Sequence, residues 1–163
     1  MINSNLTIVI PLYNKEKYIT RCLDSIVNQK MQPKKIIVVN DGSTDNGMEL
    51  IKNKYKSVEI VNVENGCVSR ARNLGFSLAM TRFVAFIDAD DEYLESFLDT
   101  ANRLIHDYPN EAMYGFGYQR CGESAIKSSV RGVADYFELY MHQNKSPHSA
   151  SSVVLNKELL SNP

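Results

Sequence analysis

The feature that most constrains the fold of this 163-residue chain is a series of four apolar runs, rich in β-branched residues, before residue 90. The runs are Leu6–Pro11, Ile36–Asn40, Val58–Val63 and Phe83–Asp88. They read as continuous rather than alternating apolar segments, a pattern typical of strands buried on both faces of a parallel sheet. The sequence therefore predicts four buried strands.

Helical patterns follow each run. Asn14 is expected to cap a helix whose apolar stripe ends at Ile26, and Thr44 or Asp45 to cap a second helix that ends near Lys54. Two further stripes are formed by Val68, Ala71, Gly75, Leu78 and Ala79, and by Leu94, Phe97, Leu98, Ala101, Leu104 and Ile105. This alternation predicts right-handed βαβ units, which build a Rossmann-like α/β fold with a mainly parallel sheet flanked by helices.

The remainder of the chain is less regular. Ala112–Tyr118 is expected to form a strand, Val133–Met141 a helix, Ser151–Leu155 another strand, and a last helix is expected to start at Lys157. No repeat or low-complexity linker divides the sequence. We therefore expect a single domain over residues 1–163.

Composition and charge exclude several classes of protein. The net charge of −1 gives no basic field for a nucleic-acid partner. The three cysteines form neither a CxxC pair nor an even-numbered disulfide set, which favours free thiols in a reducing compartment. Neither a signal peptide nor a membrane-spanning run of about 20 apolar residues is present in the sequence. We expect a soluble, cytoplasmic protein.

Polar residues gather directly after the predicted strands. They are Tyr13-Asn14, Asp41-Gly42-Ser43-Thr44-Asp45, Glu64-Asn65-Gly66 and Asp88-Ala89-Asp90-Asp91-Glu92. Ligands of open parallel α/β sheets bind beyond the carboxyl ends of the strands. These residues are therefore predicted to share one ligand-binding edge of the sheet.

The last of these segments places four carboxylates among five residues. Such close like charges repel one another unless a cation neutralises them, and Mg²⁺ or Mn²⁺ commonly binds one or two carboxylates together with substrate phosphates. Asp88, Ala89 and Asp90 abut the buried strand and are predicted to mark a metal-diphosphate site. For Asp91 and Glu92 the alternative is equally open: acidic residues also favour the start of a helix.

Three further side chains at this edge suit a nucleotide. A carboxylate at Asp41 is suited to accept a hydrogen bond from a pyrimidine imide N–H. Tyr13 is either a loop aromatic or a stacking surface for a base, and Arg72 pairs with either a diphosphate or surface carboxylates. By contrast, Gly75 is explained by a close packing contact, and Cys67 is expected to be structural.

Four motifs occur in order along the chain: IVIPLYN at residues 8–14, IIVVNDGSTD at 36–45, ENGCVSRARNLG at 64–75 and FIDADD at 86–91. Together they resemble the inverting family-2 glycosyltransferases, which have the GT-A fold. Each motif alone is weak, but all four in this order and spacing are specific. The resemblance covers residues 6 to about 108 and, less specifically, residues 151–160.

The resemblance implies a role for each matching residue. Pro11 and Tyr13 would line the base pocket, with Tyr13 stacking on uracil or a similar ring, and Asp41 would contact the base. Arg72 would help to position the donor. Asp88 would lie near the ribose or the sugar, beside Ala89.

The same resemblance implies the chemistry. Asp90, with Asp88, would bind Mg²⁺ or Mn²⁺ bridging the donor diphosphate, where the metal acts as a Lewis acid. The family transfers a sugar, often from UDP, to an acceptor hydroxyl with inversion, and a carboxylate base removes the acceptor proton. A hexosyltransferase acting on a saccharide or lipid-linked acceptor is implied, in polysaccharide biosynthesis for the cell envelope and at the inner face of the membrane.

The chain departs from the family at two residues and in length. Asn40 and Cys67 stand where the family commonly has Asp and Gly. The family's base lies on an acidic motif downstream of the region that residues 151–160 resemble, and no residue up to Pro163 matches that motif. We therefore expect a C-terminally truncated enzyme that binds its donor, with the base beyond Pro163.

Two other functions are considered. The first is a non-catalytic binding or assembly module of the same fold, which would self-associate through apolar surface left exposed by the missing part. The second is a phosphohydrolase with Asp88 as nucleophile and Asp90 as acid. Glu92 argues against it, because such enzymes usually carry a hydroxyl residue at that position.

Overall fold

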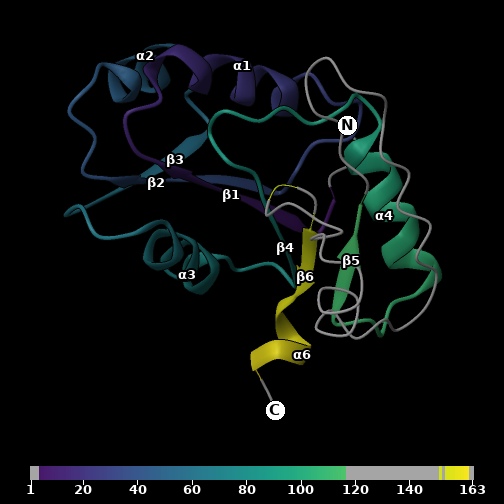
Figure 1. Ribbon diagram of the computed structural model, residues 1–163. Helices are drawn as coiled ribbons and strands as arrows, with labels where there is room; N and C mark the ends of the chain where they lie inside the picture. Colours follow the sequence, from purple (N-terminus) through teal and green to yellow (C-terminus); the bar gives the residue numbers. More distant parts are fainter. Residues whose placement is uncertain (1–3, 117–150, 152, 162–163) are drawn as a thin grey trace, which may run out of the picture.

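The computed structural model describes residues 4–116, 151 and 153–161. Its strands form one six-stranded sheet with the order β3-β2-β1-β4-β6-β5 (Figure 1). They are β1 (Leu6–Leu12), β2 (Lys35–Asp41), β3 (Val58–Val63), β4 (Phe83–Phe86), β5 (Met113–Gly115) and β6 (Val153–Asn156). The first four strands are parallel, whereas β6 runs antiparallel to both β4 and β5. The prediction of a mainly parallel sheet in an α/β fold is confirmed.

Helices cover both faces of this sheet (Figure 1). They are α1 (Glu16–Val27), α2 (Gly47–Lys54), α3 (Val68–Leu78), α4 (Phe97–Asp107) and α6 (Lys157–Ser161). The larger core cluster joins the sheet to α1, α2 and α4, and two smaller clusters include residues of α3 and its C-terminal end on the opposite face. The predicted start of the last helix at Lys157 is confirmed.

Burial on both faces explains the continuous apolar character of β1. Ile8 and Ile10 belong to the cluster under α1, whereas Val9 faces the opposite side, and all three are fully buried. Each such side chain contributes roughly 1.5–3 kcal/mol through removal from water. A Cβ at Gly75 would lie 2.2 Å from Val9 Cγ1, so the predicted close packing contact at this glycine is confirmed.

The third strand differs from the prediction of burial on both faces. β3 has the expected bounds, Val58–Val63, but only its first residue is buried and the others are partly or largely exposed. The reason is its position at the edge of the sheet, where β3 pairs with β2 alone among the described strands.

The prediction that Asn14 caps α1 is wrong. The helix begins at Glu16, with Lys15 at the N-cap position and no side-chain cap there. Asn14 lies in the left-handed region with φ of 50°, a conformation that asparagine adopts more readily than most residues. Its Oδ1 atom accepts a hydrogen bond from the backbone N–H of Thr44 at 2.8 Å, so it joins two loops instead of capping a helix.

The predicted cap of α2 is also wrong, because Asn46 precedes the helix in place of Thr44 or Asp45. Asp45 instead serves two helix starts at once. Its Oδ2 atom accepts a hydrogen bond from the backbone N–H of Glu16 at 2.7 Å, and its Oδ1 atom accepts one from Gly47 N–H at 3.1 Å. The two loops that follow β1 and β2 are thereby fixed to one another.

The fourth strand ends at Phe86, two residues before the predicted end, and α4 begins later than its apolar pattern indicates. Leu94, assigned to the apolar stripe, precedes the helix and is 71% exposed. Gln29 holds this region: its Nε2 atom donates to Leu94 O at 2.8 Å and its Oε1 atom accepts from Leu98 N–H.

The predicted strand Ala112–Tyr118 appears in its described part as β5. The predicted helix Val133–Met141 lies outside the described residues. None of the helices in the described ranges is long and apolar enough to cross a lipid bilayer.

Candidate functional site

A pocket of about 530 Å³ opens beyond the carboxyl ends of β1, β2 and β4. Every residue predicted for the site lines it: Pro11, Tyr13, Asp41, Arg72, Asp88, Ala89 and Asp90. These residues come from three strand ends and from α3, and parallel packing of the strands brings them to one edge. The structure therefore joins side chains that lie up to 79 positions apart in the sequence.

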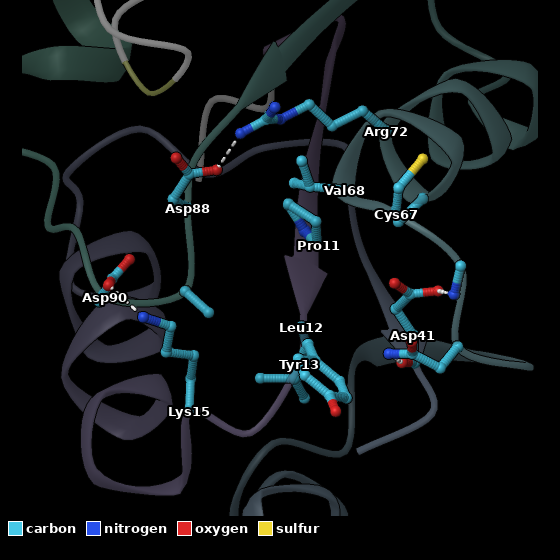
Figure 2. Close-up of a pocket in the computed structure, with 14 residues that line it drawn as sticks. Pro11, Leu12, Tyr13, Lys15, Asp41, Cys67, Val68, Arg72, Asp88 and Asp90 are labelled. Carbon is cyan, nitrogen blue, oxygen red and sulfur yellow. Dashed lines mark hydrogen bonds and ion pairs between the residues drawn. The ribbon is translucent and has the colours of Figure 1, made fainter.

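The end of β1 divides the pocket into two sides (Figure 2). Tyr13 lies at this end, half exposed, between Asp41 on one side and the Asp88–Asp90 segment on the other. A planar ring on Tyr13 would therefore have Asp41 beside it, and a group attached to that ring would extend toward the acidic segment.

Asp41 is a buried carboxylate, with an exposure of only 5%. Its Oδ1 atom accepts a hydrogen bond from Gly66 N–H at 3.0 Å, and its backbone oxygen accepts one from Asn65 Nδ2 at 2.9 Å. Gly42 makes this approach possible: its φ is 72°, and a Cβ there would lie 2.8 Å from Asn65 N. The loop after β3 thus fixes the orientation of the Asp41 side chain.

Arg72 reaches from α3 to the segment after β4. Its Nη2 atom donates to Asp88 Oδ1 at 2.5 Å, and both side chains are partly buried, with exposures of 23% and 34%. The sequence leaves open whether Arg72 pairs with a diphosphate or with a carboxylate. In the structure it pairs with the carboxylate of Asp88. The buried Nε atom of Arg72 has no hydrogen-bond partner among the described residues.

Asp90 has a different cationic partner, Lys15. Lys15 Nζ donates to Asp90 Oδ2 at 2.6 Å, and Figure 2 shows the lysine extending from below toward the carboxylate. This hydrogen bond lowers the pKa of Asp90 and raises that of Lys15. Arg21 also donates to the backbone oxygen of Asp90 and pairs with Glu92 at 2.8 Å.

The interpretation of Asp91 and Glu92 as acids at a helix start is wrong, because α4 begins only at Phe97. Asp91 instead accepts a hydrogen bond from Ser151 Oγ at 2.5 Å. The same hydroxyl oxygen accepts one from Asp88 N–H at 2.9 Å. The segment after β4 is therefore held by side chains of distant elements and not by a helix of its own.

The donor set of Asp88 and Asp90 fits a hard divalent cation that also binds phosphate oxygens, because Mg²⁺ commonly uses one or two carboxylates in this way. It does not form an all-protein cage: no group of three or more His, Cys, Asp or Glu side chains is arranged for a metal within the described ranges. One oxygen of each carboxylate already accepts a hydrogen bond from a cationic side chain. A metal would therefore need further oxygen ligands from outside the described residues, such as a diphosphate.

Seven residues that line the pocket were not assigned to the site from the sequence: Leu12, Lys15, Asn65, Gly66, Cys67, Val68 and Ala71. Lys15 follows the Tyr13-Asn14 pair at a strand end, and that position alone could have indicated it. Cys67, expected to be structural because it has no neighbouring base in sequence, is an exposed free cysteine that lines the pocket beside Gly66. Its burial could not be judged from sequence, because it lies in a loop without apolar periodicity.

Known proteins similar in sequence include glycosyltransferases and polysaccharide synthases. Glycosyltransferase GlyA of Streptococcus pneumoniae is 33% identical over 158 residues, which cover 88% of this chain and 23% of GlyA. Chondroitin synthase of Pasteurella multocida is 40% identical over 155 residues, which cover 83% of this chain and 16% of the synthase. The chain thus spans less than a quarter of the length of either relative.

Solved structures with the same fold include Staphylococcus aureus TarS in complex with UDP-GlcNAc, with a TM-score of 0.72 and 21% identity. The mannosyltransferase PcManGT of Pyrobaculum calidifontis, in complex with GDP-Man and Mn²⁺, has a TM-score of 0.66 and 19% identity. Each match covers 96% of this chain and 46% of the other. The predicted GT-A fold is confirmed.

The family model described as glycosyl transferase family 2 matches residues 7–157, which include every residue that lines the pocket. This match extends well beyond the four motifs that carry the resemblance in sequence. The chain belongs to glycosyl transferase family 2.

Proposed function

We propose that this chain forms the donor-binding part of a metal-dependent glycosyltransferase that moves a sugar from a UDP-sugar to an acceptor hydroxyl with inversion. The observation that carries the proposal is the two-sided pocket, with Tyr13 and Asp41 on one side and Asp88 and Asp90 on the other. A nucleoside diphosphate has the same division into a planar base and an anionic diphosphate.

The base side is suited to uracil. Tyr13 offers an exposed ring for stacking, with Pro11 beside it in the pocket. Gly66 holds one oxygen of the Asp41 carboxylate, and the other is assigned to the imide N–H of the base. The complex of TarS with UDP-GlcNAc supports the choice of a uracil nucleotide, although PcManGT holds GDP-Man.

The diphosphate side requires a cation. Asp90 and Asp88 would hold Mg²⁺ or Mn²⁺, which supplies Lewis-acid stabilisation of the leaving diphosphate when bound. Arg72 orients Asp88 through its hydrogen bond to Oδ1, and Ala89 lines the pocket between the two acidic residues in the sequence. The Mn²⁺ in the PcManGT structure supports a divalent ion. A saccharide or lipid-linked acceptor is proposed, and the base that removes its proton is assigned to none of the described residues.

The test is thermal unfolding of the protein with UDP and Mn²⁺, separately and together. A ligand that binds only the folded state raises the melting temperature, by roughly 5–10 °C at a concentration about 100 times Kd for a chain of this size. CDP is the matched control. Its cytosine base lacks the imide N–H, so CDP with Mn²⁺ should raise the melting temperature less than UDP with Mn²⁺. Unchanged melting with saturating UDP and Mn²⁺ would contradict the proposal and favour a module of this fold that only assembles.

A further inference from the structure

The ion pair between Lys15 and Asp90 places an ammonium group on a carboxylate that the proposed function assigns to a metal. The 2.6 Å separation of Nζ and Oδ2 is a direct hydrogen bond, and both side chains are about 40% exposed. The ammonium therefore occupies one of the four lone-pair positions of this carboxylate. It also neutralises charge that would otherwise attract a divalent cation.

The backbone of Lys15 is fixed by contacts on both sides. Asn14 is tied to Thr44 through its side chain, and the N–H of Glu16 is held by Asp45 at 2.7 Å. The Lys15 ammonium also lies 5.8 Å from the centre of the Tyr18 ring, which favours a cation at this place. The position of the ammonium near Asp90 is thus set by the fold of the loop and the first turn of α1.

The geometry points to Lys15 as a tethered counter-cation that competes with a divalent metal for Asp90. This inference rests on the proposed function. An ammonium and a divalent ion on one carboxylate repel each other, so the metal alone binds weakly while Lys15 remains on Asp90. The diphosphate of the donor supplies new oxygens for both cations, which makes Lys15 a specificity residue that couples metal binding to nucleotide binding.

The coupling has a definite size and direction. The pair is partly exposed, so solvent screening limits its effect to a small factor. Removal of the ammonium should tighten Mn²⁺ binding without nucleotide by about two- to fivefold. Because Lys15 should oppose the metal only without nucleotide, the increase in Mn²⁺ affinity caused by UDP should fall by a similar factor in the variant. By reciprocity, the increase in UDP affinity caused by Mn²⁺ should fall equally.

Electron paramagnetic resonance of free Mn²⁺ measures this directly, in titrations with and without UDP. Lys15→Met and Lys15→Gln are the test variants, and the second keeps a polar side chain in case the first folds poorly. Lys17→Met is the matched control: it removes the same charge two residues away, where the described residues offer Lys17 no ion-pair partner. Lys17→Met should leave the Mn²⁺ affinity unchanged.

A second comparison isolates Asp90. In an Asp90→Asn background, Lys15→Met should no longer increase the affinity for Mn²⁺, because the shared carboxylate is absent. Equal affinities in Lys15→Met and Lys17→Met would overturn the inference while the proposed function stands, provided that UDP and Mn²⁺ stabilise the wild-type protein. Failure of the wild-type protein to bind UDP and Mn²⁺ supplied together would overturn both.

Discussion

At the scale of single residues, the proposed function makes Asp41 the side chain that should decide which base the pocket accepts. Gly66 N–H holds Oδ1 of this buried carboxylate, so the second oxygen has a defined direction. A carboxylate oxygen accepts hydrogen bonds, and Asp41 is therefore expected to favour a base that donates at the corresponding position. Uracil donates there, whereas cytosine presents a ring nitrogen that also accepts.

The substitution Asp41→Asn should consequently invert the preference between UDP and CDP. The amide oxygen can keep the hydrogen bond from Gly66, and the amide nitrogen then faces the base as a donor. Loss of a hydrogen bond to a charged group should weaken UDP binding about ten- to hundredfold, while CDP binding improves. Calorimetric titration of both nucleotides checks this. Parallel weakening of UDP and CDP would argue against contact between Asp41 and the base.

At the scale of secondary-structure elements, the contact of α3 with the sheet positions Arg72. Gly75 lies on the same helix and permits close approach, because a Cβ there would meet Val9 Cγ1 at 2.2 Å. Ala71 of the same helix lines the pocket and also belongs to a buried core cluster. The distance between α3 and β1 therefore sets where the Arg72 guanidinium meets Asp88.

Gly75→Ala should destabilise the fold by about 1–3 kcal/mol, the usual range for an added methyl group in a packed core. Ser77→Ala on the exposed side of α3 is the control and should change stability by less than about 0.5 kcal/mol. Urea unfolding monitored by circular dichroism measures both variants. A neutral or stabilising Gly75→Ala would mean that the helix moves away from β1 at little cost, and the pairing of Arg72 with Asp88 should then weaken.

The elements also show how far sequence reasoning reaches. The bounds of the parallel strands were predicted to within about two residues because runs of apolar, β-branched residues mark strands, including β3 at the edge of the sheet, where the predicted burial was wrong. The starts of α1 and α2 were wrong because Asn14 and Asp45 hydrogen-bond across to another loop, which no local pattern reveals. The strand-end residues of the site were predicted from topology. The partners of those residues, Lys15 above all, depend on side-chain pairings between elements.

At the scale of the whole molecule, the pocket depends on a segment far along the chain. Strand β6 pairs antiparallel with β4 and brings Ser151 beside the residues that follow β4. The Ser151 hydroxyl accepts from Asp88 N–H and donates to Asp91, so one side chain holds both ends of the acidic segment.

Ser151→Ala should therefore weaken binding of UDP with Mn²⁺ by about three- to tenfold, the effect of losing one or two hydrogen bonds that position the site. The melting temperature of the protein without ligand should change little, because Ser151 is not in the core. Ser151→Thr keeps the hydroxyl and should restore most of the affinity. A loss of stability with unchanged nucleotide binding would contradict a positioning role for Ser151.

The arrangement around Ser151 has a consequence for biosynthesis. Tyr13, Asp41 and Gly66 lie within the first 66 residues, and the strands that carry them are parallel neighbours in the sheet. The hydrogen bond from Asp88 to Ser151 spans 63 positions, and closure of a loop of that length must await synthesis of the later segment. During translation, the acidic segment should therefore gain its hydrogen bonds to Ser151 later than the loops after β1, β2 and β3 can meet. On the proposed function, a nascent chain should reach its full affinity for a metal-bound nucleotide only after residue 151 has emerged from the ribosome.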